Sequence, residues 1–143
     1  MTGLIDGSLS TLAPIFAVAF ATHESHYAFL AGLATAIGAG VSMAFSEGLS
    51  DVGDLTGRGR PLWRGAITGA ATFLGGVLHT LPFLIPEFGP AVLLALAAAA
   101  LELLALAWIR RRFFGAGFIS SLITVTLAGA LIATISATLG VAT

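Results

Sequence analysis

Five long apolar runs, separated by short polar stretches, make up most of the chain. The runs cover residues 4–22, 27–50, 65–85, 91–109 and 118–142. A helix rises about 1.5 Å per residue, so runs of roughly twenty residues match the ~30 Å hydrocarbon thickness of a membrane. The sequence lacks the alternation of polar and apolar residues that is typical of a membrane-spanning barrel strand. The pattern therefore predicts an all-α integral membrane bundle of five transmembrane helices.

The composition supports a chain whose main solvent is lipid. Of its 143 residues, 57% are hydrophobic and 9% are charged, whereas an average soluble domain has about 25% charged residues. The net charge of -1 argues against binding to nucleic acid, because no basic face is available to neutralise phosphates. The connections between runs are short, so we expect residues 1–143 to form a single transmembrane domain with antiparallel neighbouring helices.

The basic residues predict how the bundle is oriented. All six are arginines, and they lie in the second and fourth connections: Arg58, Arg60, Arg64, Arg110, Arg111 and Arg112. By the positive-inside rule, these connections and the N-terminus face the cytoplasm, and the C-terminus faces outward. We expect an integral protein of a bacterial inner membrane, with the arginines setting topology and contacting anionic lipids.

Small residues recur every four positions along the second run. They are Gly32, Ala36, Gly40, Ala44 and Gly48. Such a stripe lets two helix backbones approach closely, which stabilises helix association in lipid. We interpret it as a helix-packing surface.

Three acids lie inside the predicted spans, where a charge costs about 3 kcal/mol on insertion scales. Asp6 and Glu47 fall at similar depth near the arginine-rich side, and Met43 lies one turn before Glu47 on the same helix face. Two carboxylates and a thioether favour a divalent transition metal over Mg²⁺ or Ca²⁺. We therefore expect a metal site at Asp6, Met43 and Glu47. The alternative is structural: an acid at a helix N-terminus, a methionine filler and an acid that reaches the interface.

The third acid, Glu102, has two interpretations. It is either a proton carrier on an ion pathway or an acid hydrogen-bonded to a neighbouring hydroxyl such as Ser120 or Thr124. The three histidines are His23, His26 and His79. We expect the first two to lie in a solvated loop and the third to be interfacial or hydrogen-bonded. With no cysteine in the chain, a disulfide framework or thiolate metal site is excluded.

Two segments resemble the first two helices of the vacuolar iron transporter family. They are GLIDGSLSTLAP (3–14), with the family's G-x-x-D-G pattern, and AGLATAIGAGVSMAFSEGLSD (31–51), with its S-M-A-x-x-E pattern. RGAITGAATFLGGVLHTLPFLIP (64–86) is similar to the glycine-rich third helix. The resemblance covers essentially the whole chain, although its specific motifs lie in the first 86 residues.

The resemblance implies a homodimeric exporter that moves Fe²⁺, and also Mn²⁺ or similar ions, out of the cytosol in exchange for protons. Asp6 matches the family's pathway aspartate, Met43 its second-helix methionine and Glu47 the acid of its signature. A dimer axis near the first two helices would double this ligand set. The metal is then a transported substrate, and no permanent cofactor is expected. Because buried carboxylates favour their protonated form, arriving metal would displace protons.

The chain departs from the family in two places. Some members carry an acid eight residues before the methionine, where this sequence has Thr35. Some also place an acid-rich metal-collecting domain between the second and third spans, where this link has eleven residues. The segments HTLPFLIP and ELLALAWIRRR resemble a bacterial subgroup in which a ferritin-like domain precedes the membrane part. We accordingly expect this chain to be the membrane half of a larger protein.

Two other functions fit the same features. One is a noncatalytic membrane anchor for a ferritin-like domain, which would tolerate amides in place of Asp6 and Glu47. The other is a small proton-coupled exporter of cationic drugs, although such exporters usually have four spans and aromatic-lined sites. The sequence contains no hydrolytic or redox constellation, so we expect a transporter and not an enzyme.

Overall fold

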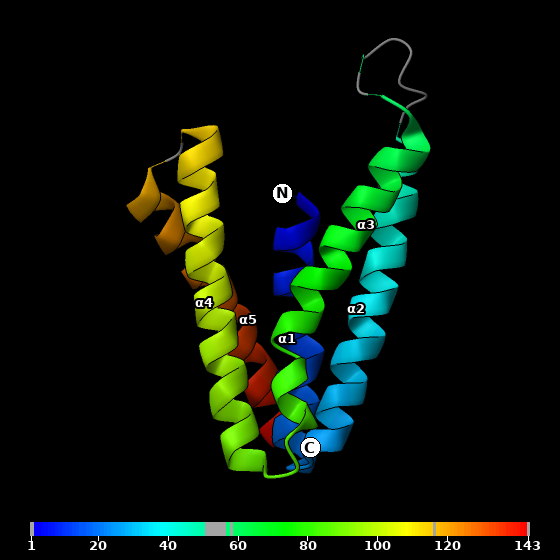
Figure 1. Ribbon diagram of the computed structural model, residues 1–143. Helices are drawn as coiled ribbons and strands as arrows, with labels where there is room; N and C mark the ends of the chain where they lie inside the picture. The colour runs from blue at the N-terminus through cyan, green and yellow to red at the C-terminus, as the bar shows by residue number, and fades with distance from the viewer. Residues whose placement is uncertain (1, 51–56, 58, 116, 143) are drawn as a thin grey trace.

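The computed structural model describes residues 2–50, 57, 59–115 and 117–142. Its elements are α1 (Thr2–Thr22), α2 (Ser25–Gly48), α3 (Pro61–Leu78), the 3-10 helix η1 (Leu81–Leu84), α4 (Phe88–Phe114) and α5 (Phe118–Val141). The described residues form helices and no strand, which confirms the all-α prediction. Successive long helices run in opposite directions (Figure 1).

Within the described part of the chain, four helices are long and apolar enough to cross a membrane: α1, α2, α4 and α5. The predicted third span, 65–85, is divided between α3 and η1. α3 ends at Leu78 because Pro82 has no backbone N–H to donate and disfavours helical geometry in the residue before it. A fifth crossing by α3 stays a prediction.

α1 lies at the centre of the molecule and contacts α2, α3 and α5. Its apolar side chains include Leu12, Ile15 and Phe16, all of which are buried. α2 and α3 pack along one another, whereas α4 contacts α5 and η1 and has few contacts with α1 and α3. The α2–α3 arm and the α4–α5 arm therefore diverge toward the end of the molecule that carries the N-terminus (Figure 1).

Small residues allow the close packing of α2 and α3. A Cβ atom added to Gly69 would lie 2.5 Å from the carbonyl oxygen of Gly40, and one added to Gly65 would lie 2.5 Å from that of Ala44. Gly32, at the other end of the stripe, lies against Thr80. The backbones of the two helices are thus in direct contact, and larger side chains at these positions would force them apart.

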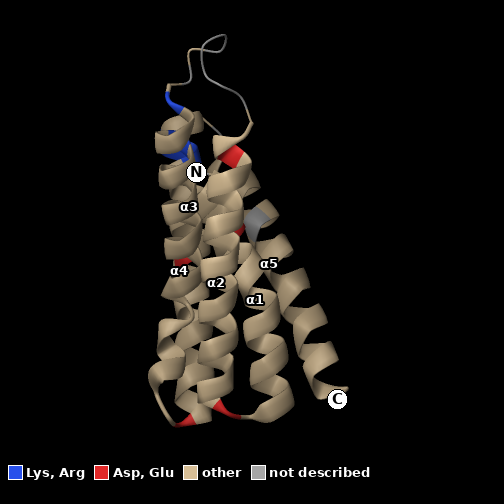
Figure 2. Ribbon diagram, turned by 90° about the vertical axis from the view of Figure 1, so that its right-hand side faces the viewer, with Lys and Arg blue, Asp and Glu red and all other residues tan. Residues whose placement is uncertain are grey.

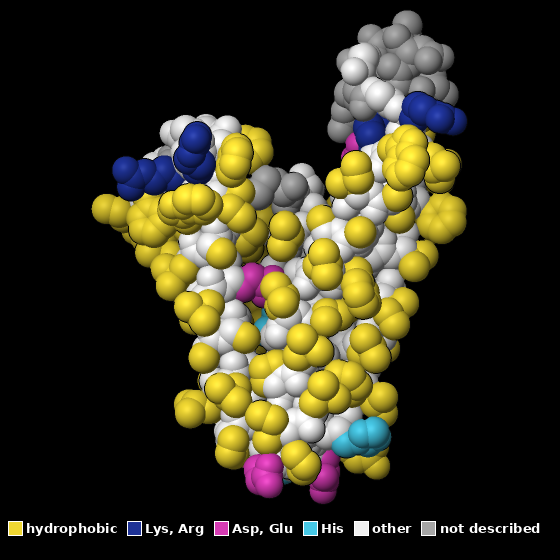
Figure 3. Space-filling view, in the orientation of Figure 1, with side chains coloured by type: hydrophobic (Ala, Val, Ile, Leu, Met, Phe, Trp, Pro, Cys, Tyr) yellow, Lys and Arg dark blue, Asp and Glu magenta, His cyan; other side chains and the backbone are white. Residues whose placement is uncertain are grey.

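Charged residues lie mainly toward the two ends of the bundle. Acidic residues lie at both ends and at points between them, whereas the arginines of α3 lie at one end (Figure 2). Arginine side chains lie at the tips of both arms (Figure 3). The C-terminus lies at the end away from the N-terminus (Figure 1). Arg58, Asp51 and Asp54 fall outside the described residues. The side of the membrane that each end faces stays a prediction.

Large apolar side chains cover the outer faces of the helices (Figure 3). Leu49 and Leu62 are 80% and 74% exposed, and similar residues follow every long helix. Soluble monomers rarely expose such continuous apolar surface. The four long apolar helices and this surface are compatible with an integral membrane protein.

Candidate functional site

Met43 and Glu47 line one hollow among α1, α2 and α3, with a volume of about 200 Å³. The spacing of four residues places the thioether and the carboxylate on one face of α2. Thr2 from α1 and Thr68 from α3 line the same hollow. The hollow therefore combines a soft sulfur, a carboxylate and two hydroxyl-bearing side chains, in a bundle whose other helix faces are largely apolar.

Asp6 lies in a different hollow, with a volume of about 490 Å³, that reaches Ile132 of α5. Gly7 packs against the backbone of α3, and Asp6, one residue earlier, points about 100° away around α1. One chain alone does not place Asp6 in the hollow of Met43 and Glu47. The two hollows adjoin at Thr2, which lines both.

Glu47 forms an ion pair with Arg64 of α3. The Arg64 Nε atom lies 3.1 Å from Glu47 Oε1, and the two side chains are 12% and 24% exposed, respectively. Nη2 of Arg64 also donates to the Glu47 carbonyl oxygen at 3.3 Å and to Ser50 Oγ at 3.2 Å. A partly buried acid needs such a partner. Arg64 therefore has a local role besides the topological one predicted for it, and it competes with any metal for Glu47.

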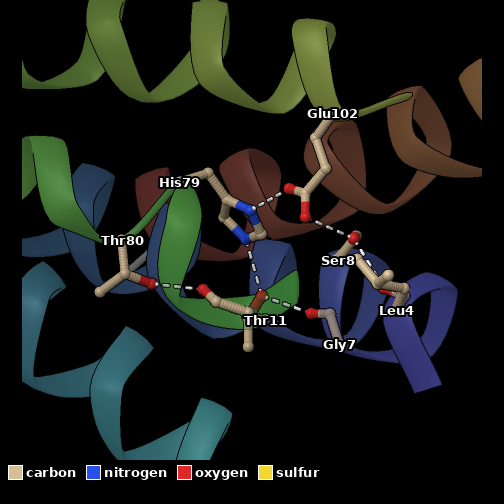
Figure 4. A network of polar contacts seen from close by, with 8 residues as sticks. Leu4, Gly7, Ser8, Thr11, His79, Thr80 and Glu102 are labelled. Carbon is tan, nitrogen blue, oxygen red and sulfur yellow. Dashed lines mark hydrogen bonds and ion pairs between the residues drawn. The ribbon is translucent and has the colours of Figure 1, made fainter. Parts of the chain in front are cut away.

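Glu102 is buried and bonded on both carboxylate oxygens (Figure 4). Oε1 accepts from Ser8 Oγ of α1 at 2.8 Å, and Oε2 lies 2.9 Å from Nδ1 of His79. The prediction that a neighbouring hydroxyl satisfies this acid is correct in kind, but the suggested α5 residues are wrong. Thr124 instead donates within α5, to the carbonyl oxygen of Ser120.

His79 extends this contact into α1. Its Nε2 atom lies 2.7 Å from Thr11 Oγ1, which also contacts the Gly7 carbonyl oxygen at 2.8 Å (Figure 4). The ring is 1% exposed and belongs to the residue that caps the C-terminus of α3. The expectation that His79 is hydrogen-bonded is confirmed. Ser8 and Thr11 were not predicted as site residues, although two hydroxyls three residues apart in an apolar run mark one polar helix face.

The carboxyl group of Glu102 also borders a hollow among α1, α3 and α4, with a volume of about 370 Å³ and otherwise apolar walls. In the space-filling view, an acidic side chain and a histidine are visible between the two arms (Figure 3). The buried network therefore contacts the space where the arms diverge.

The described residues contain no group of three carboxylate or imidazole side chains arranged to hold a metal ion. His23 and His26 are exposed, and their rings contact Phe88 and Tyr27, respectively. His23 lies in a loop as expected, whereas His26 lies in the first turn of α2. A metal in the hollow of Met43 and Glu47 would therefore need further ligands from outside the single chain or from mobile side chains.

No family model matches the chain, and comparisons with curated proteins and with solved structures found no match. The fold places the chain among helical bundles of the membrane-protein type. The resemblance to the vacuolar iron transporter family stays a prediction.

Proposed function

We propose that the chain is a transmembrane exporter of Fe²⁺, also accepting Mn²⁺, that exchanges metal for protons as a homodimer. The observation that carries this proposal is the hollow of Met43 and Glu47, which adjoins the hollow of Asp6 at Thr2. Acids inside apolar helices are expensive to insert, and they typically mark ion pathways.

The chemistry of the ligands favours this class of cargo. A thioether beside a carboxylate prefers a transition-metal dication to Mg²⁺ or Ca²⁺. The hollow of Met43 and Glu47 is lined by no cysteine or histidine that would hold the ion tightly, which suits a transporter whose ion must leave again. A second copy of the chain would supply the remaining ligands, because the described residues of one chain contain no complete site.

The arrangement supports a route into the bundle from its arginine-rich end. With the arginine-rich end in the cytoplasm, metal enters beside Glu47 and displaces the guanidinium of Arg64. It then binds the sulfur of Met43 and passes Thr2 toward Asp6. In this proposal all five predicted spans cross the membrane, and protons enter the cytosol in exchange for the metal.

Metal flux into vesicles tests the proposal. We expect Asp6→Asn, Met43→Ala and Glu47→Gln each to lower Fe²⁺ and Mn²⁺ flux by about tenfold or more, since each removes a ligand from a site with few. Glu87→Gln is the matched control, because it changes an exposed acid at the opposite end of the bundle. Equal flux in the parent and all three variants would reject the route and favour an anchor. Loss of organic-cation flux without loss of metal flux would indicate a drug exporter.

A further inference from the structure

His79 and Glu102 are the two titratable side chains that are buried among the described residues. They come from different helices and meet at 2.9 Å. An isolated charge in this environment is costly, so the pair is most stable with a net charge of zero. The neutral pair then holds two protons. One is the N–H proton of a neutral imidazole, and the other is shared between the imidazole and the carboxylate.

Two hydroxyls lie where each can serve the pair or a backbone carbonyl. Ser8 Oγ is 2.8 Å from Glu102 Oε1 and 2.7 Å from the carbonyl oxygen of Leu4. Thr11 Oγ1 is 2.7 Å from His79 Nε2 and 2.8 Å from the carbonyl oxygen of Gly7. Each hydroxyl has one proton and two possible acceptors.

A count of donors shows that three protonation states satisfy every contact between the pair and the hydroxyls. In the neutral pair, Ser8 donates to Glu102, Nε2–H of His79 donates to Thr11, and Thr11 donates to its carbonyl. After loss of the shared proton, the ring proton moves from Nε2 to Nδ1 and donates to Glu102, and Thr11 turns to donate to Nε2. When the neutral pair gains a further proton, Glu102 donates to Ser8, and Ser8 turns to donate to the carbonyl oxygen of Leu4. A proton is therefore gained by rotating the Ser8 hydroxyl, or lost by rotating the Thr11 hydroxyl together with a change of ring tautomer, without moving a helix.

Other charges near the pair are few, and most already have partners. On the packed helices, Asp6 of α1 lines another hollow, and Arg64 of α3 is paired with Glu47. The arginines of α4 begin at Arg110, about two turns beyond Glu102. α5 has no titratable side chain. A divalent cation entering the bundle is thus the main new charge that the pair would sense, and it favours loss of the shared proton.

We propose that the His79–Glu102 pair is the proton-binding site of the transporter, separate from the carboxylates that bind metal. This inference rests on the proposed function. The shared proton leaves from Glu102 into the hollow between the arms as metal enters, and the pair becomes an anion. A proton returns to the pair when the metal leaves, which restores net neutrality.

The coupling of proton movement to metal flux tests this assignment. Vesicles containing the full chain are given Mn²⁺, and lumenal pH and Mn²⁺ are recorded together. We expect Glu102→Gln and His79→Gln to lower Mn²⁺-driven proton movement by about tenfold, since an amide side chain does not bind and release a proton as a carboxylate or an imidazole does. Binding of Mn²⁺ to the purified variants should stay within about twofold of the parent, because the proposed metal ligands are intact. Unchanged proton coupling in both variants would overturn the inference and leave the exporter standing.

An infrared pH titration of the purified chain without metal provides a second measurement that does not depend on transport. We expect the parent to show the carbonyl stretch of a protonated carboxylic acid. This band should shift in Ser8→Ala, because that variant keeps the pair but removes one hydrogen bond. The same band should disappear in Glu102→Gln. If neither variant changes the spectrum, Glu102 does not bind the proton. If the band behaves as expected but the parent moves no Mn²⁺, the proton site stands and the exporter function fails.

Discussion

Arg64 is the residue that most directly links stability to the proposed transport. It lies in the first turns of α3, and its guanidinium contacts both the side chain and the carbonyl oxygen of Glu47. In the absence of metal, this cation compensates charge on Glu47. Metal binding must then include the cost of displacing the guanidinium.

Removing the Arg64 charge should strengthen metal binding. For Arg64→Gln, we expect the Kd for Mn²⁺ to fall by roughly tenfold, because displacing a charge-assisted hydrogen bond costs about 1.5 kcal/mol. Isothermal titration of the purified chain with Mn²⁺ measures this. Arg60→Gln is the control, since Arg60 is exposed and four residues earlier. Weaker binding in Arg64→Gln than in Arg60→Gln would show that Arg64 supports the site and does not compete for it.

The sequence was sufficient to show which acids need partners, but not to identify the partners. Glu47 and Glu102 are both unusual in apolar runs, and both are paired in the structure. Their partners, Arg64 and His79, lie 17 and 23 residues away on other helices. Helix periodicity relates residues within one element. It does not indicate which faces of two helices meet, so the pairs had to come from the structure.

At the scale of the helices, the bounds of α1, α2 and α5 were predictable and those of α3 were not. Length and hydropathy place α1, α2 and α5 within a few residues of the apolar runs. The run 65–85 continues in composition past Leu78, whereas the helix does not, since Pro82 interrupts its hydrogen bonding. This break lets His79 cap α3 and contact Thr11 and Glu102.

The close approach of α2 and α3 gives a prediction at this scale. Gly69→Ala should lower the free energy of unfolding by about 1–3 kcal/mol, because its Cβ would overlap the backbone of Gly40 and the side chain of Ala44. Unfolding in mixed detergent micelles, followed by circular dichroism, measures the change. The control is Gly38→Ala, whose Cβ meets no atom within 4 Å. Equal stability of the two variants would contradict the direct backbone contact.

At the scale of the whole molecule, the divergence of the two arms leaves a hollow beside the buried network of Glu102 and His79. Few contacts join α4 to α1 and α3, and the bonds of Glu102 to Ser8 and His79 connect α4 with α1 and with the end of α3. The sequence does not reveal this shape, because apolar residues facing lipid and those facing the hollow are the same in composition. The assembly of two copies is likewise a proposal that follows from the incomplete metal ligand set.

Accumulation of Mn²⁺ driven by a pH gradient tests the central claim most directly. Vesicles containing the parent chain are prepared with an acidic lumen and supplied with Mn²⁺ outside at the concentration present inside. We predict that Mn²⁺ accumulates in the lumen while the gradient lasts and stops when a protonophore removes it. Mn²⁺ uptake equal to that of protein-free vesicles, with or without the gradient, would contradict proton-coupled metal transport by this chain.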